Sequence, residues 1–117
     1  MNTCRKMVTR RKHLVPIFEY PITIIIFDYW EELKDFIPED IFKVPARGVT
    51  IEYDGYCIVC CTPKYASSIV HEAGHIKNLI WKHIGYTPMI DNDEVDQYLH
   101  TYLYEQINKV LKKHMVK

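Results

Sequence analysis

The chain has 117 residues, of which 48% are hydrophobic, and this is enough for one domain with its own core. Lys plus Arg and Asp plus Glu number 15 each, and the resulting net charge of +0 argues against a general nucleic-acid binder. The longest apolar run, YPITIIIF at 20–27, is too short to span a membrane and lacks the features of a signal peptide. We therefore expect a cytoplasmic protein that binds neither nucleic acid nor membrane.

The N-terminal residues are basic. Residues 1–13 contain Lys and Arg but no acid, and we expect them to form a solvated arm, with residues 14–117 as a single domain. The segment HLVPIFEYPITIIIF predicts an extended stretch that ends in a buried strand, with its two prolines at the strand margins. Apolar residues at helical intervals then predict a short helix over 28–37, for which Asp28 is a candidate N-cap.

Residues 49–62, VTIEYDGYCIVCCT, are typical of a β-hairpin. The Asp-Gly pair at 54–55 suits the two positive-φ positions of a type I′ turn. In the second strand the side chains alternate, so Cys57 and Cys61 point to one face and Cys60 to the other. With no second C-x-x-C in the chain, we expect reduced core cysteines and not a zinc ribbon or a redox pair.

Two helices complete the predicted fold. Apolar residues recur at helical intervals over residues 64–84, and Gly85 offers a C-terminal stop. After a polar turn, residues 94–116 predict a long amphipathic helix that Asp91 or Asn92 caps. The order strand, helix, hairpin, helix, helix predicts an α+β domain in which a small, mostly antiparallel sheet packs on these two helices.

The first of the two helices contains the sequence HEAGH at 71–75. His71 and His75 are one turn apart, so their rings project side by side and each can place a nitrogen about 2.0–2.1 Å from one Zn²⁺ ion. Glu72 flanks the same position without ligating the metal. This is where a general base for a metal-bound water stands.

We expect a third ligand from the next helix. Glu94 lies nineteen residues after His75, and an antiparallel return of the chain brings its carboxylate back beside the histidines. Asp91, Asp93 and Asp96 are close enough in sequence to be alternatives. Two histidines and a glutamate, with one open position, are a ligand set of catalytic zinc sites. The second strand of the hairpin is expected to lie along the cleft as an edge that pairs with an extended peptide.

HEAGH in this order of elements resembles the zincin metallopeptidases of the gluzincin type, and small phage-encoded and ImmA/IrrE-like members are nearest in length and layout. Residues 71–103 carry the likeness. It implies that His71, His75 and Glu94 hold zinc and that Glu72 activates the metal-bound water. The implied function is zinc-dependent hydrolysis of peptide bonds, in the host cytoplasm if the protein is phage-encoded.

The sequence departs from the zincin pattern at two positions. Lys77 stands where zincins usually have an apolar residue, and Tyr98 stands where thermolysin-like enzymes have an aspartate. Tyr98, His100 and Tyr102 are weak candidates for stabilising the oxyanion that peptide hydrolysis generates. The alternative function is that of a catalytically inactive zincin-like binding or regulatory protein, such as a phage factor acting on a host protein. The expected partner is accordingly a polypeptide substrate or a host protein.

Overall fold

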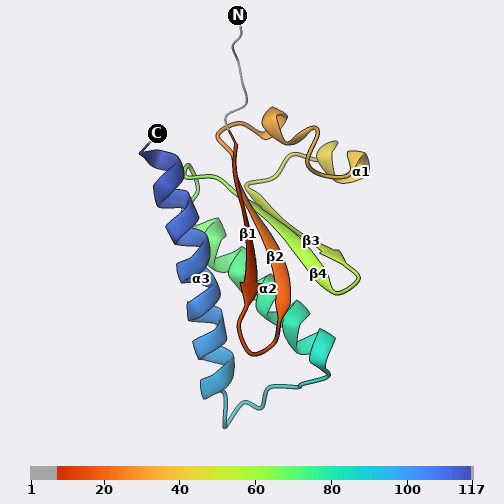
Figure 1. Ribbon diagram of the computed structural model, residues 1–117, viewed down its shortest axis with the longest axis vertical. Helices are drawn as coiled ribbons and strands as arrows, with labels where there is room; N and C mark the ends of the chain where they lie inside the picture. Colours follow the sequence, from red (N-terminus) through yellow and green to blue (C-terminus); the bar gives the residue numbers. More distant parts are fainter. Residues whose placement is uncertain (1–7, 117) are drawn as a thin grey trace, which may run out of the picture.

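The computed structural model describes residues 8–116, which form a four-stranded sheet with two long helices on one face (Figure 1). The strands are β1 (Thr9–Val15), β2 (Tyr20–Ile26), β3 (Gly48–Tyr53) and β4 (Tyr56–Cys61). The long helices are α2 (Ser67–Ile84) and α3 (Glu94–Met115), and the short 3-10 helix η1 (Trp30–Leu33) and helix α1 (Glu39–Phe42) lie between β2 and β3 in the chain. The predicted α+β class is confirmed.

The sheet has the order β1-β2-β4-β3. The pairs β1–β2 and β3–β4 are antiparallel hairpins, and a parallel pairing of β2 with β4 joins them. The edge beside α2 is therefore β3, and the expectation that the second hairpin strand forms this edge is wrong. The reason is burial: β4 is apolar and, apart from Tyr56 and Ile58, buried, whereas β3 carries the polar Thr50 and Glu52.

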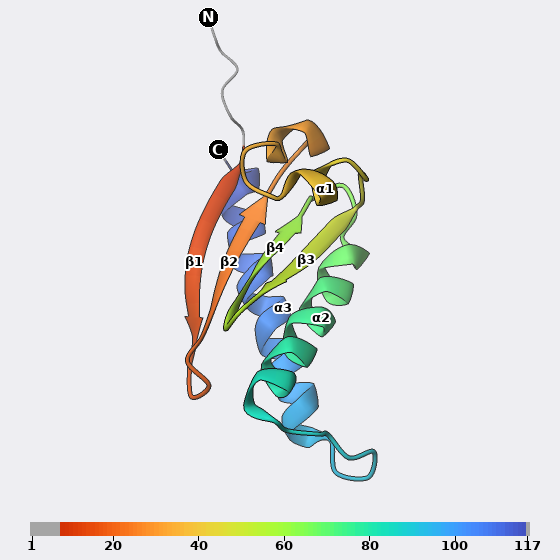
Figure 2. The same cartoon turned by 90° about the vertical axis from the view of Figure 1, so that its right-hand side faces the viewer.

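The two long helices cover one face of the sheet, with α2 over β3 and β4 and α3 over β1 and β2 (Figure 2). Their buried residues pack against alternate side chains of β2, including Ile22, Ile24 and Ile26. On the other face, the segment that contains η1 and α1 covers a second cluster around Ile25 and Phe27. Neither α2 nor any other helix within residues 8–116 is long and apolar enough to cross a membrane.

The cysteines of β4 alternate as predicted. Cys57 and Cys61 face the helices, whereas Cys60 belongs to the cluster on the opposite face. All three are free and buried, and burial raises the pKa of the Cys57 and Cys60 thiols to about 12. Their environment is that of core side chains, not of reactive thiols.

The N-terminal half contains a strand that the sequence analysis did not predict. Residues 9–15 form β1, so the expected basic arm over 1–13 is wrong for its last residues, while residues 1–7 lie outside the described part. The strand forms because its backbone pairs with β2 along its full length, and the charged side chains of Arg10 and Lys12 remain exposed. Ile17 and Glu19 take positive φ values of 71° and 50° in the turn between the strands.

Two local predictions are also corrected. The helix expected over 28–37 is only the short η1, and Asp28 does not cap it, because its carboxylate is bonded to His114 of α3 at 3.0 Å. The backbone N–H of Asp28 instead donates to the Glu32 side chain. In the β3–β4 turn only Gly55 has positive φ, at 85°, so the turn is not type I′. The predicted end of α2 at Gly85 is confirmed, with φ 75°.

Candidate metal centre

The HEAGH sequence lies in the middle of α2, with both histidines on the exposed side of the helix. Nε2 of His71 is 3.0 Å from Nε2 of His75, and the two ring planes are 89° apart. Two nitrogen ligands of a tetrahedral zinc ion, each at about 2.05 Å, are about 3.3 Å apart. At 3.0 Å the two nitrogens are hydrogen-bonded to each other, and a zinc ion would replace this bond with only a small increase in their separation.

The carboxylate of Glu72 is buried between α2 and β3. The Glu72 residue is 4% exposed, and its Oε1 accepts a hydrogen bond of 2.6 Å from the hydroxyl of Thr50. Gly48 leaves room for this side chain, since a Cβ at position 48 would lie 3.2 Å from Cγ and 3.3 Å from Oε2 of Glu72. The start of β3 thus holds the predicted base in one orientation.

These side chains line one hollow of about 390 Å³ between the edge strand and the helix. Its walls are Gly48, Val49, Thr50 and Glu52 from β3 and His71, Glu72, His75, Asn78 and Leu79 from α2. Sequence reasoning missed the contribution of β3, including Thr50. The sequence contains a hairpin but no signal for which of its strands takes the sheet edge.

The structure does not bring Glu94 to the histidine pair. Glu94 is the first residue of α3, is exposed, and is not among the residues that line the hollow. The helix α3 contacts the motif region through His100, whose Nε2 lies 3.0 Å from the carbonyl oxygen of Val70. Glu94 is six residues before His100, which corresponds to about 9 Å of helix rise. The histidine pair on α2 therefore lies opposite His100 of α3 and not opposite Glu94.

The alternative acids are not at the histidines either. Asp96 accepts hydrogen bonds from Lys77 at 2.9 Å and from the indole of Trp81 at 2.6 Å. Burial alone raises the pKa of Asp96, but these two hydrogen bonds and the charge of Lys77 outweigh it, so the pKa is below its usual value. Asp91 is exposed, and Asp93 accepts a hydrogen bond from Gln97. In residues 8–116 no three His, Cys, Asp or Glu side chains lie close enough together to hold a metal ion.

Lys77, the atypical residue after the motif, has a defined role. Its ion pair with Asp96 is largely buried, with side chains 14% and 11% exposed, and it fixes α3 against α2. Tyr98 and Tyr102, suggested for the oxyanion, lie instead on the side of α3 that faces the β1–β2 turn. The hydroxyl of Tyr102 is 2.7 Å from Nε2 of His13.

Comparisons of the chain with protein-family models, with curated proteins and with solved structures found no significant match.

Proposed function

We propose that the protein is a zinc metallopeptidase in which His71 and His75 hold the metal and Glu72 is the general base. The observation that carries the proposal is the 3.0 Å spacing of the two Nε2 atoms beside a buried carboxylate in the same hollow. When bound there, zinc would polarise the scissile carbonyl and make a water molecule more acidic.

The residues of the chain have separate tasks in this proposal. The Thr50 hydroxyl donates to Oε1 of Glu72 and restrains the carboxylate. Within residues 8–116 no hydrogen bond occupies Oε2, which in this proposal takes a proton from water and passes it to the leaving amine. The free edge of β3 forms one wall of the hollow and can pair with an extended peptide through backbone hydrogen bonds. A polypeptide is therefore the substrate class that the site suits.

The third ligand in the proposal is Glu94. Because its carboxylate lies outside the hollow, ligation requires the first turn of α3 to move along α2 toward the histidines. The contacts of Asp96 with Lys77 and Trp81 oppose this movement. Zinc binding would have to offset the loss of these contacts.

The position of α3, held on α2 by the contacts of Asp96, also favours a second function. With Glu94 held away from the histidines, the protein would be a catalytically inactive zincin-like protein that binds and regulates a host protein. The pair of His71 and His75 would then hold a structural metal ion or none. We propose a cytoplasmic location for either function, which the free thiols of Cys57, Cys60 and Cys61 support.

A peptidase assay on a mixed peptide library distinguishes the two functions. The zinc-loaded protein should cleave peptides, and Glu72→Gln should reduce turnover by roughly 10²–10⁴-fold while the bound zinc is retained. Glu105→Gln, which changes an exposed carboxylate on α3, is the matched control and should leave turnover unchanged. Absence of turnover by the zinc-loaded protein would contradict the peptidase and favour the binding protein.

A further inference from the structure

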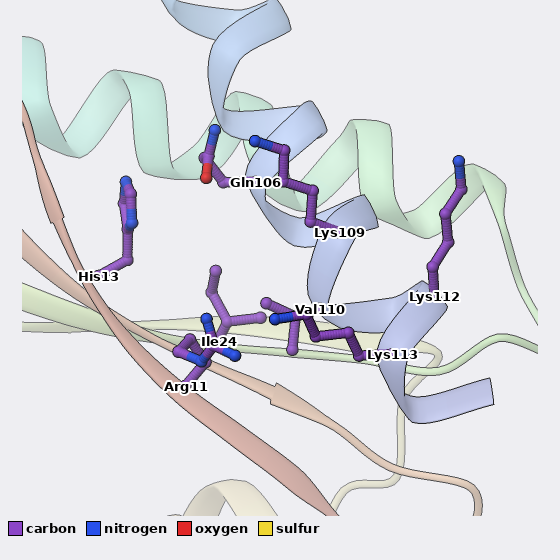
Figure 3. Close-up of a pocket in the computed structure, with 8 residues that line it drawn as sticks. All are labelled: Arg11, His13, Ile24, Gln106, Lys109, Val110, Lys112 and Lys113. Carbon is purple, nitrogen blue, oxygen red and sulfur yellow. The ribbon is translucent and has the colours of Figure 1, made fainter. Parts of the chain in front are cut away.

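The basic segments from the two ends of the sequence meet in the structure, at a hollow of about 250 Å³ between β1 and α3 (Figure 3). This basic hollow is lined by the polar side chains of Arg11, His13, Gln106, Lys109, Lys112 and Lys113. Ile24 and Val110 supply its apolar part. The basic hollow therefore combines a concentration of positive charge with a small non-polar surface.

The geometry of the two elements explains why these residues converge. Arg11 and His13 are alternate residues of β1 and lie opposite Ile24 and Ile22 of β2, on the face of the sheet that α3 covers. Residues 106, 109, 110 and 113 follow one face of α3. In Figure 3, Lys109 and Lys113 extend from α3 toward the side on which Arg11 and His13 lie, and Lys112 points away from them.

Within residues 8–116, no ion pair neutralises the positive charge of the basic hollow. No Asp or Glu lines it, and within residues 8–116 none of Arg11, Lys109 and Lys113 forms an ion pair with an acid. Burial and then the charges of Lys109 and Arg11 lower the pKa of His13. Like charges held this close repel one another, and a bound anion would remove the repulsion.

We propose that the basic hollow binds the phosphate group of a small phosphate monoester. Lys and Arg are the side chains that bind phosphate, Gln106 adds amide donors, and the apolar part accommodates the rest of a small molecule. A long polyanion is disfavoured because the net charge of the chain is +0. In addition, Arg10 and Lys12 project from the face of the sheet opposite to that of Arg11. The basic residues of β1 therefore do not form one continuous surface.

The test is an NMR titration of the full chain with inorganic phosphate and with phenyl phosphate, at constant ionic strength set with chloride. The imidazole signals of His13 report on the basic hollow. We expect saturable shifts with a Kd of roughly 1 mM or lower. The double substitution Arg11→Gln plus Lys109→Gln should weaken binding about tenfold or more. Lys12→Gln, a neighbour of Arg11 on the opposite face of the sheet, should leave binding unchanged.

Three results would overturn the proposal: shifts that rise linearly with phosphate, shifts that chloride reproduces, or equal weakening by Lys12→Gln. A single-stranded oligonucleotide that binds more tightly as its length increases would also overturn it, since that is the behaviour of a polyanion surface. If circular dichroism shows that the double variant is unfolded, Lys113→Gln, a change of an exposed side chain, replaces it. This variant should weaken phosphate binding severalfold. Binding unchanged in Lys113→Gln would then count against the proposal.

Discussion

The hydroxyl of Thr50 donates a hydrogen bond of 2.6 Å to Oε1 of Glu72 and so links the edge strand β3 to the helix that carries both histidines. Because Glu72 is buried, this bond restricts the orientation of its carboxylate beside the hollow. The relationship makes Thr50 a positioning residue for the proposed general base.

Thr50→Val keeps the size of the side chain and removes the donor. We expect peptidase activity to fall roughly tenfold to a hundredfold, mainly through kcat, because the bond is made to a charged group. Zinc content should not change. Thr50→Ser retains the hydroxyl and should preserve most of the activity. If the valine variant is as active as the serine variant in the same assay, the positioning role is wrong.

Two glycines near the site should respond to alanine in opposite ways. At Gly48 the new Cβ would lie 3.2 Å from the carbonyl oxygen of Cys60 as well as against Glu72, so Gly48→Ala should destabilise the fold by about 1–3 kcal/mol. At Gly74 the nearest atom is 3.4 Å away, in His100, an ordinary contact. Gly74→Ala should therefore be neutral or stabilising by up to about 1 kcal/mol through helix propensity. Urea unfolding measures the change in the free energy of unfolding for each variant. If both substitutions destabilised the fold, or both stabilised it, the contacts described at Gly48 and Gly74 would be wrong.

Asp96 should make the free energy of unfolding depend on pH in the acid range. Its pKa is lowered in the folded protein, so its contribution is present above the unfolded value of about 3.9 and is lost as the pH falls through the folded value. Asp96→Asn should cost about 2–4 kcal/mol at pH 7, since it leaves the largely buried side chain of Lys77 without its charged partner. The variant should also lose less stability than the wild type on acidification.

Urea unfolding across this pH range checks the prediction for Asp96. The exposed Asp91→Asn is the matched control and should change the free energy of unfolding by less than about 0.5 kcal/mol. An acid dependence of Asp96→Asn equal to that of the wild type would show that the pair of Asp96 and Lys77 does not stabilise the fold.

The proposed third ligand is tested by Glu94→Gln. If Glu94 moves to the metal, the substitution should weaken zinc binding by about tenfold or more, measured by competition with a chelator. Glu105→Gln removes an exposed carboxylate from the same helix and should have no effect. If the two variants bind zinc with equal affinity, Glu94 is not a zinc ligand. The histidine pair would then bind zinc together with other ligands.

The elements with strong local signals could be predicted from the sequence. The two long helices, the stop at Gly85, the hairpin at 49–62 and the alternation of the cysteines all follow from periodicity and from the position of glycines, and the structure confirms them. The type of the hairpin turn is the exception. The strand β1 was missed because its basic residues are typical of a solvated segment, and only its pairing with β2 makes it a strand.

The candidate site was only partly predictable for a related reason. The spacing of His71 and His75 is a property of one helix, so the sequence contains it. The contacts of Glu72 with β3 depend on the order of strands in the sheet, and the position of Glu94 depends on how α3 is docked by Asp96 and His100. Such contacts between distant elements have no local signal.

The most direct measurement of the central claim is calorimetric titration of metal-free protein, purified without an affinity tag, with zinc. We predict one zinc ion per chain and a loss of affinity of more than about 100-fold in the double variant His71→Ala plus His75→Ala, because even second-shell changes cost roughly 10–100-fold. His83→Ala, an exposed histidine on the same helix, should bind zinc as the wild type does. A wild-type protein that binds no zinc, or a double variant that binds it equally well, would contradict the account.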